Sequence, residues 1–178
     1  ANVYFSPYWP EKTARPVPKA IETMQPSAIE DPDEVMDSAQ TSNRAAVGES
    51  LLEQLRASDP SFFEQAVVDL LLKMCYGGAE KRGTAIGKSG DGGVDGVIDE
   101  DVLGLDRIYI QAKRWQGSVG RPEIQKFVGA LSGQRAKKGV LITTSRFTAD
   151  AIEYASLIET KVVLMDGEKL ASLMMDFD

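Results

Sequence analysis

The sequence predicts an α/β domain in which a mixed β-sheet carries helices on both faces. Apolar residues repeat at helical spacing in some segments, and short apolar runs typical of strands alternate with these segments. Two of the strand-like runs follow one another closely enough to form a hairpin, and the later ones are separated by helices. At 178 residues the chain is long enough for one core of ordinary size and an extension.

The N-terminal part, residues 1–42, is expected to be an extended arm or linker. It contains most of the eight prolines and an acidic stretch, and it shows neither the period of a helix nor that of a strand. The folded domain is therefore expected to span residues 43–178.

Two helices are expected before the sheet. Residues 44–56 repeat leucine at helical spacing, which places an apolar stripe on one face. A second helix has Pro60 near its first turn and Phe63 at the start of its apolar stripe, and it is expected to end at the glycine pair 77–78.

A glycine-rich stretch, residues 83–96, leads into a predicted hairpin with strands at 94–98 and 107–112. Its second strand alternates apolar and more polar residues, as a strand with unequal faces does. The remaining elements alternate along the chain: a helix from Glu123 to Lys138 stopped by Gly139, an apolar strand at 140–143, a helix capped by Thr148, a strand at 161–165 and a helix at 168–175.

The residue types that are absent narrow the possible chemistry. The chain has no histidine, which excludes Ser-His and Cys-His nucleophiles, and Cys75 has no second cysteine with which to form an internal disulfide. Hydrolysis would have to rest on carboxylates, lysine and a hard cation. Because no apolar run is long enough to span a membrane and no secretion signal is evident, we expect a cytoplasmic protein with no membrane partner.

The net charge of -7 argues against nucleic-acid binding only if it is averaged over the whole chain. Residues 1–60 hold five basic residues against ten acidic ones, whereas residues 61–178 hold 15 against 17. Arg114, Arg121 and Lys126 cluster near the candidate site described next, and we expect them to contact phosphate. A second basic cluster, residues 135–138, is expected to be a solvated helix face.

The predicted hairpin gathers polar groups at one end. If its turn is centred near Leu103, antiparallel pairing places Asp95 opposite Gln111, and Lys113 projects to the same side two residues later. The carboxylate and the amide oxygen suit Mg²⁺, which prefers oxygen ligands. The lysine could position a water molecule bound to the ion or help to deprotonate it.

Two further acids allow alternative interpretations. Glu64 lies at the edge of its helix's apolar stripe, where it could lean toward the sheet or simply favour the helix dipole as a first-turn acid. Asp91 is flanked by glycines and is either a turn former or a ligand of a second metal ion. The residues alone leave both questions open.

Five motifs follow one another along the chain: Phe63-Glu64, the glycine-rich run 90–96 around Asp95, Gln111-Ala112-Lys113, the run 119–123 and the run 141–145. This ordered set resembles the catalytic domain of Mrr-type restriction endonucleases, in the PD-(D/E)xK nuclease superfamily. The resemblance runs from residue 61 to the C-terminus, with its motif core at 61–145, and it implies the restriction-endonuclease-like fold.

The resemblance also implies roles for individual residues. Asp95, Glu64 and Gln111 would bind Mg²⁺ or Mn²⁺, with glutamine replacing the usual acid, and the backbone carbonyl of Ala112 would supply a further oxygen. Lys113 would be the catalytic lysine. Gln125, one turn along the helix from Arg121, is a further candidate for DNA contact.

The function implied is a metal-dependent DNA endonuclease that restricts foreign DNA carrying modified, methylated bases. Sensing of such bases in this family is associated with a separate winged-helix domain, whose pattern residues 1–60 lack. A homodimer or larger homo-oligomer is expected, since cutting both strands usually needs two active sites. The alternatives are an inactive nuclease fold that binds DNA or protein, and a nuclease that resolves DNA junctions.

Overall fold

The computed structural model describes residues 31–74, 83–85, 93–101 and 103–177. These residues form a five-stranded sheet in the order β1-β2-β3-β4-β5. The first three strands pair antiparallel and the last three parallel, so the sheet is mixed, as predicted. The strands are β1 (Gly83–Ala85), β2 (Gly96–Asp99), β3 (Arg107–Lys113), β4 (Lys138–Thr143) and β5 (Lys161–Met165).

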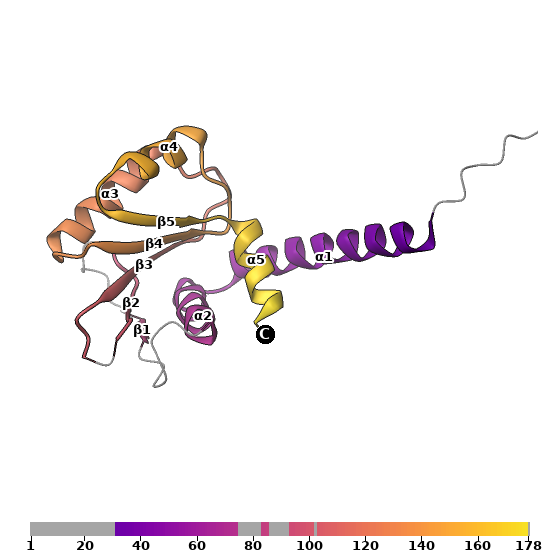
Figure 1. Ribbon diagram of the computed structural model, residues 1–178, viewed down its shortest axis with the longest axis horizontal. Helices are drawn as coiled ribbons and strands as arrows, with labels where there is room; N and C mark the ends of the chain where they lie inside the picture. The colour runs from indigo at the N-terminus through magenta and orange to yellow at the C-terminus, as the bar shows by residue number, and fades with distance from the viewer. Residues whose placement is uncertain (1–30, 75–82, 86–92, 102, 178) are drawn as a thin grey trace, which may run out of the picture.

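Helices cover both faces of the sheet, and each face has its own apolar core (Figure 1). On one face lie α1 (Pro32–Ala57), α2 (Pro60–Lys73) and α5 (Gly167–Asp176), and on the other lie α3 (Arg121–Gly133) and α4 (Ala149–Leu157). Neighbouring residues of β4 serve the two cores in turn, because Ile142 packs with the first group and Leu141 with the second.

The register of the predicted hairpin is confirmed. Gly96 pairs with Ile110 and Ile98 with Ile108, which is the pairing expected for a turn centred near residue 103. The three-residue strand β1 was not predicted, because its glycine-rich sequence carries no strand pattern. The helix cap at Thr148 is confirmed, since its side chain accepts a hydrogen bond from the Ala151 amide.

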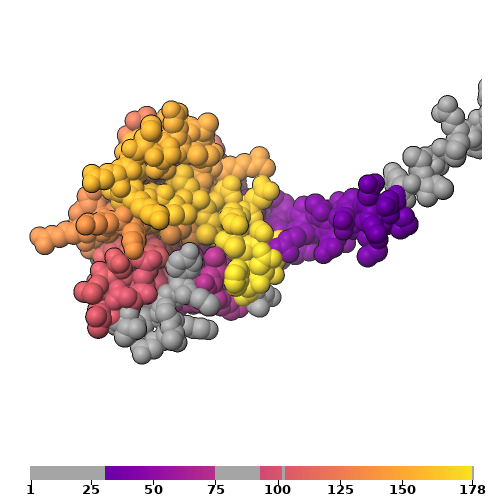
Figure 2. Space-filling view, viewed as in Figure 1, coloured from indigo at the N-terminus to yellow at the C-terminus, as the bar shows by residue number. Residues whose placement is uncertain are grey.

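The expectation of an extended arm up to residue 42 is wrong for residues 32–42, which belong to α1. Asp31 caps the helix by accepting from the Asp33 amide at 3.1 Å, and Pro32 occupies the first position. Side chains 32–47 are exposed, and Figure 2 shows this part of α1 projecting from the body of the molecule. No apolar period marks these turns because they pack on nothing in the described part of the chain.

The C-terminal end predicted for the helix at residues 123–138, which is α3, is also wrong. α3 stops at Gly133, Arg135 takes a positive φ of 57°, and Gly139 lies inside β4 instead of ending the helix. A Cβ on Gly139 would stand 2.7 Å from Cζ of Phe127, so α3 can lie this close to the sheet only above a glycine. The predicted glycine stop of α2 at residues 77–78 lies outside the described residues.

The structure describes the helices of residues 31–74 and 103–177. None of these helices is both long enough and apolar enough to cross a bilayer.

Candidate active site

Asp95 stands immediately before β2 and is tied to β3 twice. Its backbone amide donates to the Ile110 carbonyl at 2.8 Å, and its Oδ2 accepts from the Ala112 amide at 2.7 Å. The second bond continues the hairpin ladder through a side chain, which fixes the carboxylate beside the end of β3. Burial raises the pKa of Asp95, although the Ala112 amide and the charge of Lys113 act in the opposite direction.

Gln111 carries a buried oxygen that lacks a partner. The residue is 9% exposed, and its Oε1 accepts no hydrogen bond from the described residues. Its Nε2 lies 3.1 Å from where a Cβ on Gly93 would be, so glycine there leaves room for the amide and also permits the local φ of 93°. An orphaned buried acceptor costs about 1–3 kcal/mol, which a cation or a water molecule bound at this point would offset.

Glu64 lies on α2, which packs on the face of the sheet opposite to the one that α3 covers. It is half-buried, and its pKa is raised first by burial and then by the negative charge of Asp95. The negative charge of Asp95 thus acts on Glu64 and makes its ionisation less favourable. Two half-buried acids with raised pKa values form the kind of site that a divalent cation stabilises.

Lys113 ends β3, and its side chain contacts two residues. Its Nζ lies 2.8 Å from Oε2 of Glu123, a residue in the first turn of α3, and 5.1 Å from the centre of the Trp115 ring. Lys126 approaches the other carboxylate oxygen, Oε1 of Glu123, at 2.6 Å. The pKa of Glu123 is accordingly lowered, first by its hydrogen bond from Lys113 and then by that from Lys126.

Glu123 is the site residue for which the sequence analysis proposed no role. It stands in one of the motifs that carry the family resemblance, and its position as a first-turn acid beside the lysine strand was the available signal. Only the packing of α3 on the sheet brings it to Lys113.

The donor set fits a hard divalent cation. Asp95 and Glu64 supply carboxylates, Gln111 supplies an unpartnered amide oxygen, and the Ala112 carbonyl belongs to the same strand end. Among the described residues no cluster of three or more His, Cys, Asp or Glu is arranged to hold a metal, so neutral oxygens would have to complete the shell. Asp91, the predicted ligand of a second ion, lies outside the described residues.

The four residues predicted to contact DNA lie in different surroundings. Arg114 is half-buried near the start of α2, where its charge adds to the hydrogen bonds from Ser61 in lowering the pKa of Asp59. Arg121 faces α4, because it pairs with Asp150 at 3.4 Å and lies 4.6 Å over the Tyr154 ring. Gln125 and Lys126 are exposed on α3, and Lys126 binds Glu123.

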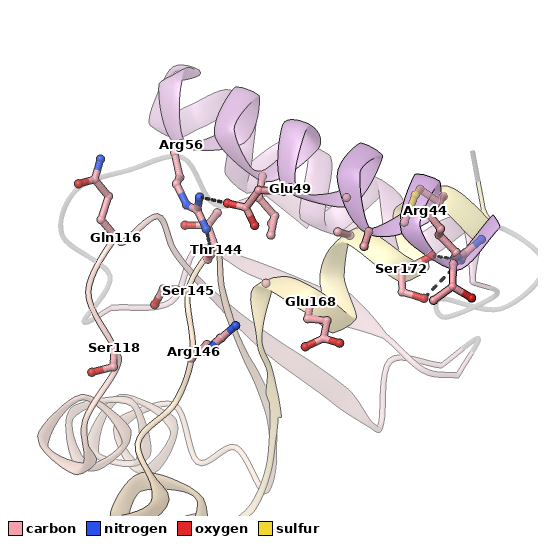
Figure 3. Close-up of a pocket in the computed structure, with 17 residues that line it drawn as sticks. Arg44, Glu49, Arg56, Gln116, Ser118, Thr144, Ser145, Arg146, Glu168 and Ser172 are labelled. Carbon is pink, nitrogen blue, oxygen red and sulfur yellow. Dashed lines mark hydrogen bonds and ion pairs between the residues drawn. The ribbon is translucent and has the colours of Figure 1, made fainter. Parts of the chain in front are cut away.

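A groove of about 710 Å³ lies along the same edge of the sheet, between α1, α5 and the loops that follow β3 and β4 (Figure 3). Arg56 reaches across it from α1 and donates to the Thr144 carbonyl at 2.6 Å, and the Thr144 amide donates to the Lys113 carbonyl at 3.3 Å. The floor of the groove is thus continuous with the strand that carries Lys113. Arg146, exposed in this groove, forms no ion pair within the described part of the chain.

The family of the chain follows from its match to a known protein-family model. The model of the Mrr catalytic domain, described as a restriction endonuclease, matches residues 55–174, which is about two thirds of the chain. The chain belongs to the Mrr restriction endonuclease family. The family predicted from the motifs is therefore confirmed, and the match includes Glu64, Asp95, Gln111 and Lys113.

One curated relative of this Mrr-family chain is the type IV methyl-directed restriction enzyme EcoKMrr of Escherichia coli K12. The two are 50% identical over 145 residues, which are 82% of this chain and 47% of the relative. The chain thus spans about half the length of that enzyme.

Two solved structures resemble this Mrr domain in fold. The DNA modification-dependent restriction endonuclease AspBHI superposes with a TM-score of 0.59 at 20% identity, covering 74% of this chain and 35% of that one. The MspJI restriction endonuclease, solved with a 27-mer oligonucleotide, gives a TM-score of 0.55 at 24% identity over 76% of this chain and 32% of its own. The restriction-endonuclease-like fold predicted from the sequence is confirmed.

Proposed function

We propose that this Mrr-family domain hydrolyses phosphodiester bonds in DNA and needs a divalent cation, Mg²⁺ or Mn²⁺, to do so. The observation that supports the proposal best is the unpartnered buried Oε1 of Gln111, which stands beside Asp95 and Lys113 in a member of a restriction endonuclease family. A domain that only bound DNA would gain nothing from a buried acceptor without a partner.

The proposed metal ligands are Asp95, Glu64, Gln111 and the Ala112 carbonyl. A bound divalent cation would lower the pKa of a water molecule and offset the charge that develops on the phosphate. The chain's own part is to hold the Asp95 carboxylate in place through the hydrogen bond from the Ala112 amide, and to present the Lys113 ammonium to the attacking water and the phosphate.

Contacts to the DNA backbone are proposed for cations at the same edge of the sheet. Arg114 directly follows Lys113, and Arg146 is exposed in the adjoining groove with no ion pair among the described residues. Gln125 and Lys126 are exposed on α3 beside Glu123 and could extend this surface. Arg121 is a weaker candidate, since Asp150 and Tyr154 already engage its guanidinium.

The biological role that we propose is restriction of foreign DNA carrying modified bases. The support is the 50% identity to an enzyme described as methyl-directed. We further propose that the protein acts in the cytoplasm as a homodimer or larger homo-oligomer, because cleavage of both strands usually needs two active sites.

The test is cleavage of supercoiled plasmid DNA in the presence of Mg²⁺, Mn²⁺ or EDTA. We expect nicked and linear products with either metal and none with EDTA. Replacing Lys113 with alanine should lower the rate by about 100-fold or more, the size typical for loss of a group that assists proton transfer.

A matched control is Lys137→Ala, which removes the same charge from an exposed site at the opposite, amino end of β4. Its rate should stay close to that of the wild type. Cleavage that proceeds in EDTA, or that is equally fast in both lysine variants, would rule out the mechanism.

A further inference from the structure

Lys113 is paired with Glu123, an acid that is not among the metal ligands proposed above. Glu123 is 9% exposed, and its side chain bonds Lys113 at 2.8 Å and Lys126 at 2.6 Å. The two lysines differ in setting, because the side chain of Lys113 is 18% exposed and that of Lys126 is 73% exposed. The pair with Lys126 is therefore easily replaced by water, whereas the pair with Lys113 is well shielded.

The acid itself is held firmly in place. Its backbone amide donates to the Gly120 carbonyl at 3.1 Å, within the first turn of α3. Val119, the residue before Gly120, is fully buried. Its amide donates to the Arg146 carbonyl at 2.7 Å, and its carbonyl accepts from the Thr148 amide at 3.0 Å, so it is tied to the loop after β4. Glu123 is thus presented from an anchored helix start, and its carboxylate is a fixed point against which a flexible side chain can be ordered.

Lysine needs such a fixed point more than most residues do. Its four-carbon side chain carries about 2 kcal/mol of rotamer entropy, which must be lost before the ammonium can act at one position. The contact with Glu123 uses one of the three N–H donors of Lys113 and leaves two for water or phosphate. The charge of Lys113 also lowers the pKa of Asp95, so the ammonium acts on the metal-binding side as well as on Glu123.

We propose that Glu123 is a positioning residue that holds the Lys113 ammonium ready for phosphodiester hydrolysis. This inference rests on the function proposed above. The competing explanation is that the ion pair only anchors α3 to the sheet, and it predicts a different outcome: loss of the pair would then reduce stability and DNA affinity together.

The experiment compares Glu123→Ala and Glu123→Gln with the wild type in two assays. Single-turnover cleavage of a plasmid substrate with Mg²⁺ measures the rate, and fluorescence anisotropy of a labelled duplex in EDTA measures DNA affinity without metal. Because the substitutions free Lys113 and remove a negative charge near the DNA, affinity should stay the same or increase a fewfold. The rate should fall about tenfold or more for alanine and less for glutamine, which keeps an oxygen acceptor.

The matched control is Asp99→Asn, which removes an acid of a partly exposed ion pair with Arg107 at the hairpin end of β2. Its rate and affinity should equal those of the wild type. Should Glu123→Ala fail to fold, as judged by thermal melting, Glu123→Gln decides alone, since it preserves side-chain volume.

Two results would overturn the positioning role. One is a rate that is unchanged in every Glu123 variant that folds, and the other is a parallel fall in rate and affinity. A wild-type protein that cuts no DNA under any metal condition would instead refute the proposed function itself, so the two failures are distinguishable.

Discussion

At the scale of single residues, the two acids of the site oppose folding when no cation is bound. The pKa values of Asp95 and Glu64 are both raised, mainly by burial. A carboxyl group whose pKa is higher in the folded state binds its proton more tightly there, so protonation favours folding. Their contribution to stability is present at low pH and is lost as the pH rises through the raised pKa values.

Replacing Asp95 with asparagine should therefore raise the melting temperature of the metal-free domain at neutral pH. The amide oxygen can still accept the bond from the Ala112 amide, while the unfavourable buried charge is removed. The gain should shrink as the pH falls through the raised pKa of Asp95, where the wild-type acid becomes neutral. Thermal melts in EDTA across this pH range measure the effect.

The same melts with Mg²⁺ provide a second check on the metal site. The ion should stabilise the wild type and have little effect on Asp95→Asn. An exposed acid on α4 serves as the control, since Asp150→Asn should show neither the metal effect nor a comparable pH-dependent gain. A variant that is less stable than the wild type at neutral pH without metal would contradict the prediction.

At the scale of elements, the packing of α3 on the sheet determines where Glu123 stands. Phe127 and Leu131 both lie within 3 Å of the place that a Cβ on Gly139 would occupy. The fully buried side chains of this helix thus rest directly on the backbone of β4. Any residue larger than glycine at position 139 would push α3 away from the sheet.

Gly139→Ala is accordingly expected to destabilise the domain by about 1–3 kcal/mol, the usual cost of overpacking a core. The matched substitution is Gly129→Ala in the middle of α3, where an added Cβ meets nothing within 4 Å. There alanine should stabilise the domain by up to about 1 kcal/mol through its higher helix propensity.

Urea unfolding of both alanine variants measures the difference. We also expect Gly139→Ala to slow DNA cleavage, because a displaced α3 carries Glu123 away from Lys113. Equal stabilities for the two variants would show that the close contact between α3 and β4 is not maintained in solution.

At the scale of the whole molecule, only the C-terminal half of α1 belongs to the body of the domain. Leu52 and Leu55 enter the core, and a Cβ on Gly48 would stand 3.5 Å from that of Ala171 on α5, so the two helices cross closely there. Arg44 pairs with Asp176 and donates to the Ser172 carbonyl, both on α5. The preceding turns project into solvent.

Removal of residues 1–43 should therefore leave the domain folded and active. The melting temperature is expected to change by no more than about 2 °C and the cleavage rate by less than about twofold, since the side chains of residues 32–43 are exposed and such residues contribute little to stability. Leu52→Ala in the full chain is the contrasting variant and should cost about 2–5 kcal/mol. A large loss of activity on truncation would mean that the projecting helix contributes to assembly or DNA binding.

The sequence by itself determined the parts of this protein that depend on local pattern. The register of the β2–β3 hairpin followed from the symmetry of one turn, and with it the pairing that puts Asp95 beside the end of β3. The Thr148 cap and the bounds of β5 followed in the same way from single residues and short runs. These features arise from steric and hydrogen-bond preferences that neighbouring residues express wherever they occur.

Only the tertiary structure decided how the elements meet. It brought Glu123 to Lys113, set Glu64 near Asp95, and showed that Gly139 makes room for α3 instead of ending it. It also showed that residues 32–42 form a helix without an apolar stripe. Contacts of this kind depend on the distance and angle at which two separate elements pack, and no periodicity within either element encodes them.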